Sequence, residues 1–271
     1  MKIRLAAILV LLFHTLNADV RFFPRVIYVD ANEQSSVIYL QNPSQSDKKY
    51  KLYFGYTDQD ESGKFIHKKK SELTDSDRYG CDWLKVFPKR IDLKANDKQS
   101  IRVSVKVPTD VPEGEYYCRL YAKSQPMPRE LDTNNPDVKA MISTIMIIGA
   151  PIHIKKGNPE LNISASINIE SITSDKIALN IDLKNSSLIG IRGNLIVAVV
   201  DSDGEPVIQK EIKVTVQTSK RKIMQEIDIS SLPAGKQKLY YYLSDSQDVK
   251  KGFELIGDEQ KRIGEIVFEK P

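Results

Sequence analysis

Residues that carry out chemistry are scarce in this sequence. Its 271 residues include three histidines, two cysteines and one tryptophan. A structural zinc site takes four Cys or His ligands, and Ser-His-Asp or Cys-His catalysis needs a well-placed histidine. The sequence also lacks the glycine-rich phosphate-binding loop of nucleotide hydrolases. We therefore expect a protein that is not an enzyme and that has no metal or other cofactor.

The chain also lacks a large net charge, because its basic and acidic residues are nearly equal in number. The chain has 40 Lys and Arg residues against 36 Asp and Glu residues. Two of the basic residues, Lys2 and Arg4, lie in the first segment; removing them from 40 leaves 38 against 36, a net charge of +2. A chain so nearly balanced gives no electrostatic reason to expect nucleic-acid binding.

Long hydrophobic runs are missing too, because the longest at the N-terminus, Leu5–Phe13, is too short to cross a bilayer as a helix. Lys2 and Arg4 precede it and the small residue Ala18 follows it, a pattern typical of a secretory signal peptide over residues 1–18. The alternative is a membrane anchor or a buried helix. Since no later run is long enough to cross a membrane, we expect an exported, soluble protein without stable membrane insertion.

Export favours a disulfide between the two cysteines, Cys81 and Cys118. The alternatives are two buried free thiols, or a metal or redox pair. The last is disfavoured because the spacing is far from Cys-x-x-Cys and no histidine accompanies it.

What the sequence does contain is one short strand pattern after another, without a helical stripe. Ile101–Val107 alternates apolar and polar residues, as a half-buried strand does. About seven such segments precede Pro151, and a second set of similar number follows it. This pattern predicts an all-β protein: two immunoglobulin-like β-sandwich domains in tandem after the signal peptide, at residues 19–150 and 151–271.

One short segment supports the immunoglobulin-like reading. Tyr116 lies two residues before Cys118, at the head of a late strand, where a tyrosine corner belongs. Cys81 falls on the predicted fourth strand rather than the second. The inter-sheet bridge that is usual in antibody domains is therefore absent.

The order and spacing of several segments resemble those of the periplasmic chaperones of pilus and fimbrial assembly. The resemblance covers most of residues 22–155, whereas the C-terminal half matches only as a second sandwich of suitable size. The segments that carry it are Pro24–Tyr28, Leu40–Pro43, Phe87-Pro88, Gln99–Val103, Pro108–Asp110, Pro112–Tyr116 and Val138–Gly149.

The resemblance implies an ATP-independent chaperone in the periplasm that binds and caps exported pilin-like subunits, with an outer-membrane usher as a further partner. Such a chaperone lends the last strand of its N-terminal domain to a subunit that lacks one. That strand would be Val138–Ile148, apolar on both faces, and the sequence does not fix which face is lent. The client-binding residues expected on it are Val138, Ala140, Met141, Ile142, Ile145, Met146 and Ile147.

The resemblance also implies a role for Arg25. In the family, an arginine on the first strand lies in the cleft between the domains and anchors the C-terminal carboxylate of the client, to which its planar fork is suited. The family's second anchor, a lysine on the lent strand, is replaced here by Met146. Lys155 or Lys156 could take its place.

Two alternatives remain open from the sequence. The strand Val138–Ile148 could be covered on both faces within the protein, by the second domain or by a dimer mate. The chain could then be an exported structural or adhesive protein of two immunoglobulin-like modules that self-associates through this strand.

Overall fold

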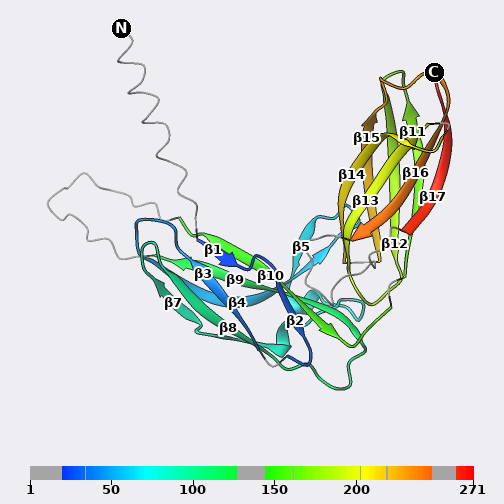
Figure 1. The fold of residues 1–271 in the computed structure, drawn as a ribbon. Helices are drawn as coiled ribbons and strands as arrows, with labels where there is room; N and C mark the ends of the chain where they lie inside the picture. Colours follow the sequence, from blue (N-terminus) through cyan, green and yellow to red (C-terminus); the bar gives the residue numbers. More distant parts are fainter. Residues whose placement is uncertain are drawn as a thin grey trace, which may run out of the picture. The chain divides into compact units, whose positions relative to one another are not determined.

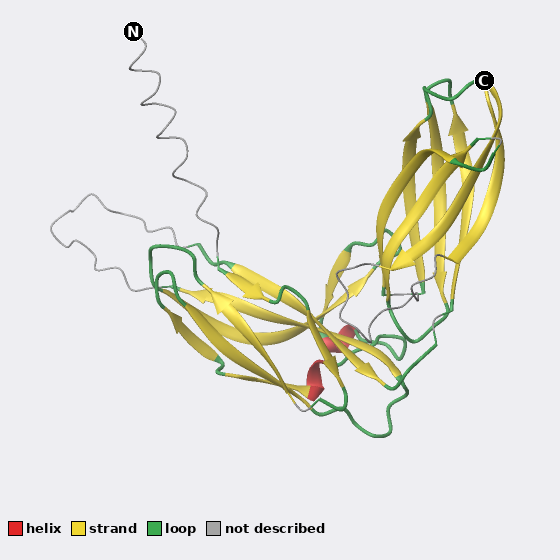
Figure 2. Cartoon of the chain, in the orientation of Figure 1, coloured by secondary structure: helices red, strands yellow, loops and turns green. Residues whose placement is uncertain are grey.

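A computed structural model describes residues 20–33, 35–126, 144–160, 162–201, 203–217, 219–245 and 261–271. The predicted signal peptide, 1–18, lies outside these ranges. Figure 2 shows that the described chain consists almost entirely of strands and loops, with two short 3-10 helices. None of the described helices is long and apolar enough to cross a bilayer.

The chain divides into two compact units. The first comprises Met1–Gly55, Tyr79–Thr109 and Tyr117–His153; the second comprises Tyr56–Arg78, Asp110–Tyr116 and Ile154–Pro271. The sequence predicted one continuous segment for each domain, 19–150 and 151–271, whereas each unit is built from three segments. Two segments that precede residue 150 belong to the second unit.

One sheet of the first unit has the strand order β1(Arg21–Phe23), β3(Ser35–Gln41), β8(Lys98–Val105) and β6(Leu84–Phe87). All of its pairings are antiparallel. Alternate residues point inward, and Ile38, Leu40, Ile101 and Val103 are completely buried. β8 (Figure 1) confirms the strand predicted at Ile101–Val107 as far as Val105, where the strand ends.

The other sheet contains, in order, β2(Ile27–Asp30), β10(Ile147–Lys156), β9(Gly114–Gln125) and β4(Lys48–Gln59), with β7(Arg90–Leu93) also paired to β4. The chain leaves the first sheet after Phe23 and enters this one at Ile27, by way of a bend that contains Pro24. Proline has no N–H to donate and so interrupts the ladder. The inward residues Leu120, Ala122 and Ile152 are buried and complete the core of the sandwich.

Three local details test the predictions for this half of the chain. The hydroxyl of Tyr116 donates to the carbonyl of Pro112 at 2.8 Å, which is the predicted tyrosine corner. Cys81 lies in the 3-10 helix η2(Cys81–Trp83) and not on a strand as predicted. The last strand was predicted to end before Pro151, but β10 continues through it to Lys156, because neighbouring residues still pair and only one donor is lost.

The predicted disulfide between Cys81 and Cys118 is confirmed. It joins η2 to β9 and closes a loop with a sequence separation of 37 residues. The end of β4 from Tyr56 on, β5(Phe65–Lys68) and the 3-10 helix η1(Lys70–Glu72) precede η2 in the chain and belong to the second unit.

Replacing both cysteines by alanine should lower the free energy of unfolding of the first unit by about 4 kcal/mol, the chain-entropy value for a loop of this length. Urea unfolding followed by the fluorescence of Trp83, the only tryptophan, would measure it. Reduction of the unmodified protein should give a similar loss. A loss below about 1 kcal/mol in both cases would show that the bridge contributes little.

The second unit contains the predicted second sandwich. One sheet has the order β11(Ile163–Ile172), β12(Lys176–Asn185) and β15(Lys220–Asp228). The other has the order β14(Pro206–Val216), β13(Ile191–Val200), β16(Gly235–Asp245) and β17(Lys261–Lys270). Alternate residues of β12, from Ile177 to Leu183, are buried in one hydrophobic cluster with residues of β13, β14 and β16. The fold class predicted from the sequence, all-β with two sandwiches in tandem, is thus confirmed.

A buried ion pair lies in this second unit. The carboxylate of Glu115 is fully buried, accepts a hydrogen bond from the guanidinium of Arg192 and accepts another from the N–H of Gly190 at 2.8 Å. The N–H of Glu115 donates to the carbonyl of Leu188 at 2.7 Å. Since a buried carboxylate is costly without such partners, these bonds tie segment Asp110–Tyr116 to the sandwich.

Candidate functional site

Met146, directly before β10, is hydrogen-bonded to β9. The N–H of Ser124 donates to the carbonyl of Met146 at 2.8 Å, and the N–H of Met146 donates to the hydroxyl of Ser124 at 2.8 Å. Both polar groups of the Met146 backbone therefore point toward β9. Because successive residues of a strand direct these groups to opposite edges, those of Ile147 point away from β9.

The other edge of β10 is covered by β2 for only part of its length. β2 has 4 residues and β10 has 10. The rings of Tyr28 and His153 stack with centroids 5.2 Å apart, which places β2 beside the later half of β10. Ile147 is six residues earlier, about 20 Å along the strand. From Tyr28, β2 extends at most two further residues, about 7 Å, so we infer that it stops short of Ile147.

The side chains at this open edge are apolar and exposed. Ile145 and Ile147 are 52% and 50% exposed, whereas Ala150, Ile152 and Ile154 are buried in the core. The later residues of β10 therefore stabilise its own domain, whereas Ile147 at its first position and Ile145 just before it are exposed to solvent. Unpaired backbone groups beside exposed apolar side chains form a template to which another strand can add.

Next to these isoleucines, three side chains of β4 and β9 lie on the outward face of the sheet. The rings of Tyr53 and Tyr121 stack at 5.2 Å, and burial raises the pKa of Tyr121. Gly149 of β10 leaves room for this arrangement, since a Cβ there would lie 2.9 Å from both Arg119 Cδ and Tyr121 Cε1. Position 149 therefore requires glycine, because any larger residue would collide with the side chains of Arg119 and Tyr121.

The structure assigns a place to half of the predicted client-binding residues. Ile145 and Ile147 are exposed, Met146 is half-buried on the opposite face, and Arg25 is exposed. The isoleucines therefore belong to the outward face, which the sequence left open. The other predicted residues of this strand lie outside the described ranges: Val138, Ala140, Met141 and Ile142.

Arg25 was expected on the first strand, but it lies in the bend between β1 and β2. It makes no hydrogen bond or ion pair with another described residue. Of the two lysines considered as replacements for the missing family lysine, Lys156 donates to the carbonyl of Val111. Its ammonium group therefore already has a partner in the protein.

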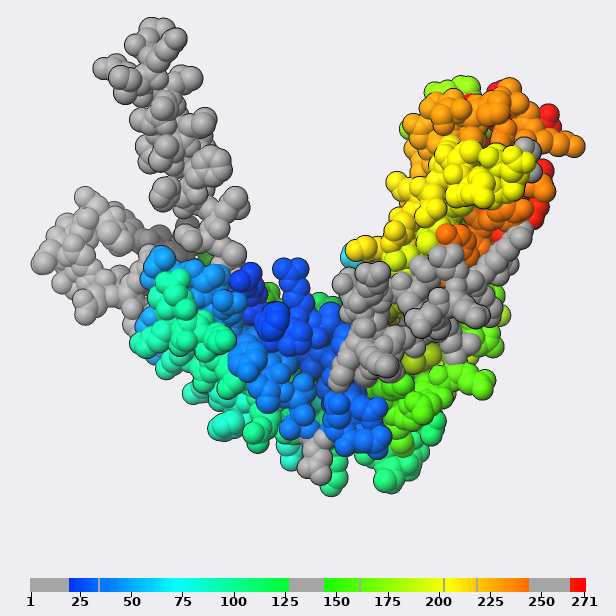
Figure 3. All heavy atoms as spheres, viewed as in Figure 1, coloured from blue at the N-terminus to red at the C-terminus, as the bar shows by residue number. Residues whose placement is uncertain are grey.

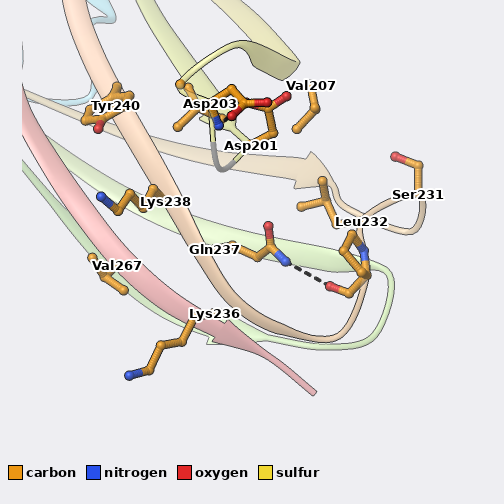
Figure 4. A pocket seen from close by; sticks show the side chains of 13 residues that line it. Asp201, Asp203, Val207, Ser231, Leu232, Lys236, Gln237, Lys238, Tyr240 and Val267 are labelled. Atoms are coloured by element: carbon orange, nitrogen blue, oxygen red, sulfur yellow. Dashed lines mark hydrogen bonds between the residues drawn. The ribbon is translucent and has the colours of Figure 1, made fainter.

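A separate hollow of about 850 Å³ lies in the second unit, between the β13–β14 turn, β16 and β17 (Figure 4). Its polar groups serve the local backbone: Asp201 accepts from the N–H groups of Asp203 and Glu205, and Gln237 donates to the carbonyl of Pro233. They form no ligand set. No three His, Cys, Asp or Glu side chains of the described residues are placed to hold a metal ion together.

No protein-family model and no curated protein matches this chain. Among solved structures, it is similar to the Class 5 fimbriae chaperone CfaA, with 16% identity and a TM-score of 0.49 over 93% of this chain and 99% of that one. It is also similar to a chain of the CsuC–CsuE chaperone–tip adhesion subunit complex of Acinetobacter baumannii, with 17% identity and a TM-score of 0.48 over 91% and 97%. The complex of SafA pilin with the SafB chaperone from Salmonella enterica matches with 10% identity and a TM-score of 0.44 over 93% and 96%.

Proposed function

We propose that this protein is a chaperone that binds and caps pilus- or fimbria-type subunits by strand addition to β10. The observation that carries the proposal is the open edge at the start of β10, where the backbone of Ile147 points away from β9 and the side chains of Ile145 and Ile147 are exposed. A subunit that lacks one strand of its own sandwich has a matching deficit, an uncovered core and two unpaired edges.

Strand addition meets both needs of such a subunit. Hydrogen bonds to the backbone of β10 satisfy its unpaired edge, and the isoleucines enter its core at alternate positions. The burial of apolar side chains supplies the driving force, so no nucleotide is required. We propose that the protein acts without catalysis and without a cofactor.

The remaining residues of the predicted site complete this proposal. We propose that Val138, Ala140, Met141 and Ile142, which lie outside the described residues, also bind the subunit, and that Met146 supports the lent strand from the other face. Arg25 supplies a charge-assisted hydrogen bond to a carboxylate of the subunit.

We further propose that the protein is exported to the periplasm, where the subunits it caps pass on to an outer-membrane usher. The apolar run Leu5–Phe13 with Lys2 and Arg4 supports export. The disulfide of Cys81 and Cys118 supports an oxidising compartment.

Co-expression with a strand-deficient subunit tests the function directly. We expect a stable one-to-one complex in the periplasmic fraction, with its mass measured by size-exclusion chromatography and light scattering. The open edge would equally accept a second copy of this chain. Sedimentation at several concentrations distinguishes the two: homo-oligomers that persist when the subunit is present would contradict capping and support self-association.

The proposed role of Arg25 leads to a separate prediction. Arg25→Glu should weaken subunit binding by about ten- to a hundredfold, the range expected for loss of a hydrogen bond between charged groups. Isothermal titration calorimetry would measure it. Arg90→Glu makes the same charge change at another exposed arginine of the first unit and should leave affinity nearly unchanged. Equal losses in both variants would remove Arg25 from the site.

A further inference from the structure

The outward face of the sheet β1-β3-β8-β6 carries large apolar side chains. Phe23 and Phe87 are 67% and 76% exposed, and Val37 and Tyr39 also stand out from the sheet. Strand register brings them together: Phe23 lies opposite Tyr39, and Val37 lies in one row with Arg102 and Phe87. Four large apolar side chains from β1, β3 and β6 therefore occupy two adjacent rows, with Arg102 of β8 between Val37 and Phe87.

The charges on the same face are all positive. The alternate, outward positions of these four strands hold Arg21, Lys85, Lys98 and Arg102, and they hold no Asp or Glu. Each of the four cations is exposed, and the Lys98 ammonium lies 5.4 Å from the centre of the Tyr39 ring. Because the whole chain is nearly balanced at +4, this is a local separation of charge and not a consequence of composition.

Figure 3 shows that the first strands, in blue, and the blue-green residues near 100 reach the surface of this unit. We define the face by its eight apolar and cationic residues and call it the basic apolar face. They are Arg21, Phe23, Val37, Tyr39, Lys85, Phe87, Lys98 and Arg102.

The charges on this face indicate which kind of binding partner fits it best. A second copy of the chain, docked by the same face about a two-fold axis, would bring like charges together. A protein partner would need an acidic patch that complements these cations in shape and position. This face is positively charged throughout and carries exposed phenylalanines. It therefore matches a membrane, whose anionic headgroups cover an apolar interior.

We propose that the basic apolar face docks on an anionic phospholipid surface. Phe23 and Phe87 stand on the two edge strands, β1 and β6, so both rings enter the headgroup region when the sheet lies parallel to the membrane. Lys85, Lys98 and the two arginines keep their charged ends at the phosphates while their stems cover the apolar rows. The backbone stays in its sheet, so the attachment is peripheral and reversible.

Flotation of the full chain with vesicles tests this. The protein should bind vesicles of phosphatidylglycerol mixed with phosphatidylethanolamine, and it should bind neutral phosphatidylcholine vesicles at least about tenfold more weakly. Binding should fall steeply as the salt concentration rises, because the Debye length shortens to about 3 Å at 1 M.

Two double variants separate the contributions. Lys85→Glu with Arg102→Glu should weaken vesicle binding at least about twenty-five-fold, from roughly fivefold per cation. Phe23→Ser with Phe87→Ser should weaken it by roughly tenfold or more. Lys49→Glu with Lys51→Glu is the matched control, since it changes net charge equally at exposed lysines of β4, in the other sheet.

The outcomes are decisive in either direction. Circular dichroism should confirm that every variant is folded. Binding that is lost only in the two variants of the face supports the proposal. No binding to the anionic vesicles at low salt, or an equal loss in the control, overturns it. A face that proves to bind an acidic protein or a second copy, while ignoring vesicles, also overturns it.

Discussion

Ile145→Asp combined with Ile147→Asp should abolish capture of a subunit, with a loss of affinity of at least about a thousandfold. Strand addition would carry both new carboxylates into the apolar core of the partner, and each would lose its hydration without gaining a cation. Because both side chains are about half exposed in the free protein, the variant should fold as the parent does. Titration calorimetry with the purified subunit would give the affinity.

Val207→Asp with Val267→Asp is the control for that variant. These valines are 51% and 55% exposed, close to the two isoleucines, but they lie on β14 and β17 of the second unit. The control should keep most of the affinity. If the isoleucine variant binds as tightly as the control does, β10 does not enter the partner and the proposed mechanism is wrong.

Glu115→Gln should destabilise the second unit by about 3 kcal/mol or more, since it removes the carboxylate charge that faces the buried guanidinium of Arg192. Urea unfolding followed by circular dichroism would measure the loss. Trp83 belongs to the first unit, so its fluorescence would report that unit separately.

Two further variants show whether the charge pair itself is responsible. Glu115→Leu with Arg192→Met removes both charges and should recover much of the stability lost by the single variant. Glu61→Gln breaks the exposed pair of Glu61 with Lys222 and should cost less than about 1 kcal/mol. A loss for Glu115→Gln no larger than that for Glu61→Gln would contradict the importance assigned to the buried pair.

The sequence predicted those features that depend on local pattern. Alternation at Ile101–Val107 predicted β8, and the spacing of Tyr116 and Cys118 predicted the tyrosine corner. The disulfide of Cys81 and Cys118 followed from export and from there being only two cysteines. Each of these predictions depends on a pattern within a few neighbouring residues or on the number of cysteines in the chain.

Features that depend on long-range partners could not be predicted in this way. Glu115 and Arg192 are 77 residues apart, and nothing in either local sequence indicates that they meet. Pro151 was taken as the end of a strand, but pairing on both sides carries β10 past it. β2, the neighbour of β10, has only 4 residues, and nothing in the pattern of β10 itself indicates how far that neighbour extends.

Amide hydrogen exchange at Ile147 tests the central claim most directly. In the free protein this N–H points away from β9, and β2 lies beside the later half of β10, so the N–H should exchange rapidly. In the complex with a subunit it should be protected by at least about a hundredfold, because an added strand would accept its hydrogen bond. An exchange rate at Ile147 that is the same with and without bound subunit would contradict strand addition at β10.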